Sequence, residues 1–339
     1  MNQRIAHTRQ DSDLFGLIYG FRFRPGERGQ EIDSATALDC LHTPQDPEAF
    51  IWLHLNLAHA ACQRWMKSNL ELPEEFFQAL HEGSRSTRIE HVDASLLAVV
   101  NDVVFDFGMV SSDISTLWVC TRSHLMISAR QQPLHSVDRL RHSVKRGECF
   151  RSPLELLTHL LRDQGEVLEQ IVRKTTLSVD KIEDQLLSSR LSENRADLGA
   201  MRRVLVRLQR LLALEPSSLM RVLNRPPAWL LDADVQELRQ STDESALVIS
   251  DLIALGERIK LLQEEIAAKL NEQSNRTLFT LTVVTVLALP INIIAGFFGM
   301  NVGGIPLATD PEGFWVLVAL VATFTLLAGR WAFRKRDVF

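Results

Sequence analysis

The sequence predicts an α/β domain, followed by a bundle of long helices and two C-terminal transmembrane helices. Three observations support this prediction. Short extended and helical runs alternate up to residue 150, leucine-rich helical periodicity dominates from residue 152, and two apolar runs, Leu278–Phe298 and Phe314–Phe333, close the chain. Each apolar run approaches the roughly 20 residues that are needed to cross a bilayer.

The N-terminal domain, residues 1–150, mixes strand-like and helical segments. Two segments have helical character, Ala58–Leu70 and Pro73–His81. Five segments are apolar or alternate apolar with polar residues, as strands do: Leu14–Phe23, Phe50–Leu57, Leu96–Phe107, Thr116–Thr121 and His124–Ser128. Only Arg122 and Ser123 separate the last two, which indicates a tight hairpin.

Residues 151–231 are expected to form an antiparallel helical bundle. Ser152 suits the N-cap, Pro153 the first helical position, and Glu155 can reach back as in a capping box. Helical periodicity runs to about Leu191 and resumes from Ala196 to about Leu223, where the run 225–228 ends it.

A third helical segment starts near Asp232 or Asp234 and meets no strong breaker before Pro290. Its cytoplasmic part, 232–275, would be the stalk of a helix roughly 80–100 Å long. Apolar residues recur along it at steps of three and four and form a seam that packs on other helices: Val248, Leu252, Leu255, Ile259, Leu262 and Ile266.

A second stripe with the same spacing lies on roughly the opposite side and continues into the membrane. It is here called the polar stripe, and its members are Glu257, Leu261, Glu264, Ala268, Asn271, Asn275, Leu278, Thr282, Thr285, Leu289, Asn292 and Gly296. Polar groups at membrane depth face protein or water rather than lipid. Periodicity alone leaves two interpretations open, a pore-lining face and a face that seals helix packing.

The two spans, 276–300 and 314–334, are joined by a short loop, 301–313, and are therefore antiparallel. A two-helix hairpin is too thin to enclose a pathway, so transport would need several subunits. The loop has no lysine or arginine, and its only charged residues are Asp310 and Glu312. Basic residues flank the spans on the other side of the membrane: Lys269, Arg276, Arg330, Arg334, Lys335 and Arg336. By the positive-inside rule both termini, including the basic tail 335–339, are cytoplasmic. In a bacterium this is a multi-pass inner-membrane protein.

Composition excludes several classes of function. A net charge of −5 gives no reason to expect a nucleic-acid partner. The four cysteines form no C-x-x-C pair and are interpreted as reduced thiols. The N-terminus lacks the apolar core of a signal peptide. No P-loop, G-x-S-x-G, H-E-x-x-H or G-x-G-x-x-G motif occurs, so we predict neither an enzyme nor a bound cofactor.

All ten histidines lie within residues 7–159, and none has the H-x-x-x-H spacing of a helical metal site. Individually they are interpreted as satisfied core or surface residues, although a cytoplasmic regulatory zinc site stays open. The polar stripe has no His, Cys, Asp or Glu within the membrane. Because zinc prefers nitrogen and thiolate ligands, the ion would cross at least partly hydrated.

The triplet Gly299-Met300-Asn301 ends the first span, with Pro290 and Gly296 upstream. This arrangement resembles the signature of the CorA superfamily of divalent-cation transporters, and the resemblance covers the whole architecture. Residues 51–56 (IWLHLN) and 302–306 (VGGIP) are similar to the ZntB zinc-transporter branch, and the acidic loop of magnesium-type members is absent.

The resemblance implies a funnel-shaped homopentamer whose first spans line a central pore. In this arrangement Asn301 presents carboxamide oxygens to an incoming hydrated ion, Gly299 lets the backbone leave the helix, and Met300 packs to fix the loop. The remaining implied roles concern the span: Leu278 and Leu289 are constrictions that close by dewetting, Asn275 and Asn292 are polar rings, and Pro290 bends or loosens the helix.

The predicted function is therefore transport of divalent cations, with Zn²⁺ as the first candidate. The predicted direction is uptake, and coupling to protons stays open. A proton pathway would have to use acidic groups outside the span, either Asp310 and Glu312 or Glu257 and Glu264. Two alternatives stay open, a magnesium/cobalt channel and a membrane-anchored metal sensor or scaffold.

Overall fold

The computed structural model describes residues 13–42, 46, 48–83, 87–103, 114–187, 194–213, 216–300, 306 and 310–336. The chain divides into two compact units, Met1–Leu262 and Gln263–Phe339. Helix α8 extends from the first unit into the second.

The first unit is built on a seven-stranded mixed sheet with the order β2-β1-β3-β7-β6-β5-β4. Its strands are β1 (Leu17–Phe23), β2 (Gln30–Ile32), β3 (Phe50–Asn56), β4 (Arg88–Val92), β5 (Ser95–Val103), β6 (Ile114–Arg122) and β7 (Leu125–Arg130). Only the central pair, β3 and β7, is parallel, and it places His54 beside Ser128. β3 is buried along almost its whole length, as a strand with helices on both faces must be.

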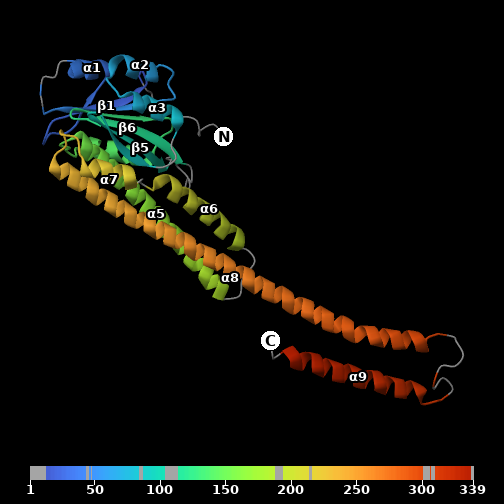
Figure 1. The fold of residues 1–339 in the computed structure, drawn as a ribbon. Helices are drawn as coiled ribbons and strands as arrows, with labels where there is room; N and C mark the ends of the chain where they lie inside the picture. The colour runs from blue at the N-terminus through green and yellow to red at the C-terminus, as the bar shows by residue number, and fades with distance from the viewer. Residues whose placement is uncertain are drawn as a thin grey trace. The chain divides into compact units, whose positions relative to one another are not determined.

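Helices cover both faces of the sheet (Figure 1). On one face, α1 (Ser34–His42), α2 (Cys62–Asn69) and α3 (Glu74–Glu82) enclose a core that includes Trp65, Phe76 and Trp118. On the other face, α4 (His135–Arg146), α5 (Pro153–Leu187) and α7 (Pro216–Asn224) enclose a second core around Trp52 and Phe150. The prediction of an α/β domain is confirmed.

The five predicted strands and the two predicted helices are all present, with shifted bounds: β6 and β7 are longer than predicted, whereas α2 is shorter. The part of the predicted strand Leu96–Phe107 beyond Val103 lies outside the described residues. Four elements were not predicted: α1, β2, β4 and α4. β2 has only three residues, which is too short for a periodic signal. α4 does carry such a signal, because Val137, Leu140 and Val144 are buried at helical spacing.

The prediction of one helix from Ala196 to Leu223 is wrong. The structure has two helices there, α6 (Asn194–Leu212) and α7, which begins at Pro216. Proline has no N–H to donate to the preceding turn, so it ends one helix, but it is well suited to start the next. The end of α5 near Leu191 cannot be compared, because residues 188–193 lie outside the described part.

The start of α5 has the predicted helix cap, but the Glu155 side chain bonds to a different backbone N–H than expected. The Glu155 N–H donates to Ser152 Oγ at 3.1 Å, as an N-cap requires. The Glu155 carboxylate accepts from the backbone N–H of Arg151 at 2.5 Å, one residue before the expected donor. The arginine side chain also pairs with Glu237 at 2.7 Å and so connects this start to α8.

α8 (Asp232–Phe298) is continuous, as predicted, with Pro290 inside it. At 1.5 Å per residue it is about 100 Å long. The predicted apolar seam is confirmed, because Leu252, Leu255, Ile259, Leu262 and Ile266 are buried and Val248 is half-buried. Beside the seam, Arg258 pairs with Asp180 at 2.8 Å and with Glu183 on α5. The last helix is α9 (Gly313–Arg336).

Candidate functional site

The two C-terminal helices are long and apolar enough to cross a membrane. Their most apolar stretches have mean hydropathies of 2.2 in α8 and 1.7 in α9, and 0% and 6% of these stretches is buried in the chain. The core helix of a soluble protein would be mostly buried. These side chains therefore need an environment that the single chain does not supply.

All members of the polar stripe on α8 are exposed in the single chain, from Glu257 to Gly296. The two apolar members that were predicted as constrictions, Leu278 and Leu289, are 58% and 59% exposed. The seam residues on the same helix are buried. Where the two stripes run side by side, up to Ile266, they thus differ in environment: the seam is buried and the polar stripe is exposed. In the membrane part of α8 the other faces of the helix are largely exposed as well.

The threonine hydroxyls of the stripe bond to their own helix. Thr282 Oγ1 donates to the Leu278 carbonyl and Thr285 Oγ1 to the Leu281 carbonyl, both at 2.8 Å. A hydroxyl has one proton, so these groups have no donor left and offer only oxygen lone pairs. The water shell of a cation offers only O–H donors to its surroundings. The stripe is therefore suited to a hydrated cation.

Pro290 adds a further acceptor near the stripe. Because proline lacks an N–H, the carbonyl of Val286, one turn earlier, loses its usual helical partner. In a membrane such a group must find another donor, from protein or from water in a cavity. The bend that was predicted at Pro290 stays a prediction.

The motif at the end of the first span is described only in part. The Gly299 N–H donates to the Ala295 carbonyl at 2.9 Å, and a Cβ on Gly299 would lie 3.1 Å from that oxygen. α8 ends at Phe298, so the chain leaves the helix at Gly299, without a positive φ at this glycine. Met300 is 48% exposed, and Asn301 lies outside the described residues.

The acidic candidates are exposed, and three of them have ordinary local contacts. Asp310 Oδ1 accepts the Glu312 N–H at 3.0 Å, and the Asp310 carbonyl accepts the Gly313 N–H at 3.1 Å, where α9 begins. Acidic groups are favourable at this end of a helix. In the stalk, Glu257 lies 3.7 Å from Lys260, and Glu264 is exposed.

Comparison with known proteins decides the family. The sequence profile described as "CorA-like Mg2+ transporter protein" matches residues 47–335 of this chain. The chain belongs to the CorA family. It is 28% identical to the "Divalent cation transporter CmaX" of Pseudomonas aeruginosa, covering 96% of this chain and 98% of that protein. It is 23% identical to the "Zinc transport protein ZntB" of Pectobacterium atrosepticum, covering 84% and 87%.

Solved structures agree with the family assignment. The full-length CmaX structure has a TM-score of 0.81 at 26% identity and covers 95% of this chain and 99% of that one. The CorA magnesium transporter from Methanocaldococcus jannaschii has a TM-score of 0.72 at 18% identity and covers 92% and 96%. This CorA protein therefore has two C-terminal transmembrane helices, transports divalent cations and is not an enzyme.

The histidines of this CorA protein's sheet domain form no metal cluster in the part of the chain that the structure describes. Among the residues that the structure describes, no group of three or more His, Cys, Asp or Glu side chains could hold a metal ion. The interpretation of His54 as a satisfied core residue is confirmed. Its ring is fully buried, with Nδ1 2.8 Å from Ser128 Oγ and Nε2 2.8 Å from Arg130 Nε.

These contacts fix the tautomer of His54. A guanidinium can only donate, so Nε2 accepts and the proton lies on Nδ1, which donates to Ser128 Oγ. That oxygen also accepts from Trp52 Nε1 at 2.8 Å. Burial lowers the pKa of His54 well below its usual range, and the guanidinium groups of Arg130 and Arg141 lower it further. His54 is thus a neutral structural residue.

A second histidine, His159, has a different environment. Its two ring nitrogens lie 3.2 Å from Asp163 and 3.3 Å from Glu148, and Arg139 on α4 lies 3.4 Å from Asp163. The hydrogen bond to Asp163 raises the pKa of His159. This ionic cluster, which links α4 to α5, was not predicted. His159 and Asp163 are one helical turn apart, but no local pattern indicates that Arg139 and Glu148 contact them.

Proposed function

We propose that this chain is one subunit of a homopentameric zinc transporter. The α8 helices surround a central pore, and hydrated Zn²⁺ passes along the polar stripe into the cytoplasm, where the sheet domain lies. The observation that supports this proposal most strongly is the exposed stripe itself, whose threonine oxygens are free only as acceptors.

The same observation favours a pore over a face that seals helix packing. If identical stripes met directly, the threonines at each level would bring acceptor against acceptor and gain no hydrogen bond. A file of water and hydrated cations supplies the missing donors. Asn275 and Asn292, which carry both donors and acceptors, can join neighbouring subunits or contact the ion's water.

We propose zinc rather than magnesium as the substrate because several relatives are named as zinc transport proteins. The sequences of residues 51–56 and 302–306 support the same choice. The stripe offers zinc no nitrogen or sulfur ligand within the membrane, so the ion keeps water ligands as it crosses. A negative interior drives inward flow of cations by about 2.3 kcal/mol per charge per 100 mV. Uptake therefore needs no nucleotide.

Reconstitution in liposomes tests the proposed substrate. The protein is inserted into vesicles that contain zinc-sensitive or magnesium-sensitive dyes, with and without an imposed pH gradient. We expect zinc to enter while little magnesium enters. Magnesium entry at an equal or greater rate would assign the protein to the magnesium-transporting members instead.

The acidic residues before α9 provide a test of proton coupling. Asp310→Asn with Glu312→Gln removes the titratable groups of the described loop and keeps an acceptor oxygen at position 310 for the Glu312 N–H. We expect this double variant to flatten the dependence of zinc influx on external pH. The measurement is the initial influx rate across a pH series. A pH profile identical to that of the wild type would exclude these residues from coupling.

A further inference from the structure

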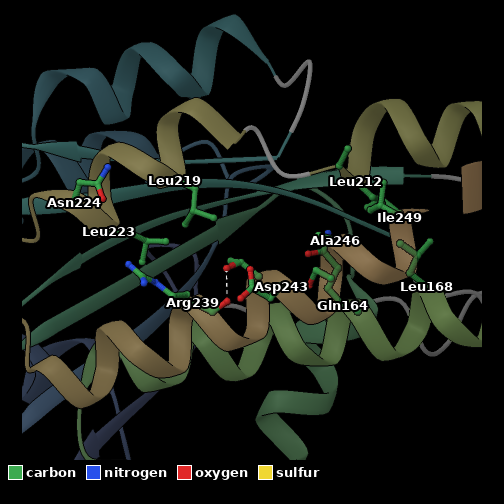
Figure 2. Close-up of a pocket in the computed structure, with 14 residues that line it drawn as sticks. Gln164, Leu168, Leu212, Leu219, Leu223, Asn224, Arg239, Asp243, Ala246 and Ile249 are labelled. Carbon is green, nitrogen blue, oxygen red and sulfur yellow. Dashed lines mark hydrogen bonds between the residues drawn. The ribbon is translucent and has the colours of Figure 1, made fainter. Parts of the chain in front are cut away.

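A cavity of about 710 Å³ lies among α5, α6, α7 and α8 within the first compact unit (Figure 2). Its volume falls in the range of small-molecule pockets in proteins. It is remote in sequence from the membrane-spanning part of α8, and the transport proposal does not use it. Its walls are mainly apolar, with a few polar groups.

The two ends of the cavity differ in chemistry. Leu168, Leu212 and Ile249 lie together at one end, whereas Asn224 and Arg239 lie at the other, with Leu223 between them (Figure 2). A cavity whose cationic group lies at one end and whose other end is apolar fits a linear amphiphile, with its head group at the first end and its chain at the second.

The charge at the polar end indicates the sign of the head group. Within the described part of the chain, the Arg239 guanidinium has no ion-pair partner, although Asp243 follows it by one turn of α8. A guanidinium with free N–H groups binds a carboxylate through two parallel hydrogen bonds. The Asn224 carboxamide, at the same end of the cavity (Figure 2), adds another donor.

The walls are anchored to the sheet, so the space is part of the folded structure. Near the end of α6, the Leu211 carbonyl accepts from Thr87 Oγ1 at 3.2 Å and from Asn101 Nδ2 at 2.9 Å. Gln164 Nε2, from the α5 wall, donates to the Asn101 carbonyl. An apolar space that stays open leaves its lining side chains without contacts on one side, and an occupant would supply them.

We propose that this cavity binds a linear amphiphilic carboxylate of the fatty-acid type. Its carboxylate pairs with Arg239 and Asn224, and its chain lies between Leu168, Leu212 and Ile249. Each added methylene should strengthen binding roughly fourfold until the apolar end is filled.

The test uses the full-length protein in lipid nanodiscs and a dodecanoic acid that carries a photoactivatable diazirine. Crosslinked peptides are identified by mass spectrometry. We expect saturable labelling of peptides from 164–168, 212–224 and 239–249, with dodecanoic acid competing about tenfold better than dodecanol. Labelling confined to the membrane-spanning parts of α8 and α9 would overturn the proposal.

Two variants of opposite charge on the same rim form the matched pair. Arg239→Gln should weaken labelling of these peptides about tenfold, whereas Asp243→Asn, which removes a negative charge from the same rim, should leave labelling unchanged or strengthen it. The reverse pattern would indicate a cationic ligand and would contradict the proposal. Ala246→Met, which fills the cavity from α8, should also abolish labelling, with an unchanged thermal transition as the control for folding. Full labelling of a folded Ala246→Met protein would likewise count against the cavity.

Discussion

We expect the double substitution Thr285→Val/Asn292→Leu to lower zinc influx through the reconstituted protein by about tenfold or more. Both residues lie on the polar stripe, and the change replaces acceptor oxygens with methyl groups of similar size. Each hydrogen bond that a stripe residue accepts from the water shell contributes about 0.5–1.5 kcal/mol, so a hydrated cation that loses two of them would meet a higher barrier at this level. Stopped-flow influx into dye-loaded liposomes measures the effect.

Thr280→Val is the matched control. Thr280 lies on the same helix, is exposed, and donates to the Arg276 carbonyl at 2.9 Å as the stripe threonines do to theirs. It faces away from the stripe, so we expect influx within about twofold of the wild type. Equal losses in the two variants would mean that the face of α8 does not matter, which would contradict a pore along the stripe.

The largest effect on stability is expected for His54→Ala, which should lower the free energy of unfolding by about 3 kcal/mol. The substitution leaves a cavity and removes both the acceptor for Arg130 Nε and one donor to Ser128 Oγ in a fully buried network. Denaturant unfolding of the full-length protein, followed by tryptophan fluorescence, measures it. His124→Ala, at an exposed hairpin position, should change stability by less than about 0.5 kcal/mol.

The depressed pKa of His54 also predicts a direction of pH dependence. Below about pH 6.5 the unfolded chain binds a proton on this histidine, whereas the folded protein does not until a much lower pH. The contribution of His54 to the free energy of unfolding is therefore complete above pH 6.5. It is lost as the pH falls below this value, by at most about 1.4 kcal/mol per pH unit. His54→Gln should reduce this acid sensitivity, and an unchanged slope would contradict the buried neutral assignment.

The sequence was most informative where a periodic pattern ran long. The continuous α8, its buried seam and its second stripe were all predicted from steps of three and four, because a helix of this length repeats the same environment many times. Short elements repeat nothing, so β2 was missed. The break before α7 was missed for another reason. Pro216 could have indicated it, but the leucine periodicity continues on both sides of this proline and was interpreted as one helical segment.

The candidate site shows the same limit. The position of each stripe residue followed from spacing, but the back-bonded state of Thr282 and Thr285, which leaves them as acceptors only, needed coordinates. The network around His54 joins β3 to β7 across 76 residues of sequence. No local pattern indicates such a contact, and neither does any pattern indicate the cavity beside Arg239, whose walls come from four helices.

The most direct test of the pore is disulfide crosslinking of single cysteines in a background without Cys40, Cys62, Cys120 and Cys149. We expect Thr285→Cys and Asn292→Cys to yield covalent dimers under mild oxidation in membranes, from particles whose native mass corresponds to five chains. Thr280→Cys should remain monomeric. Crosslinking at position 280 with none at 285 and 292, or a native mass of two chains, would contradict the account.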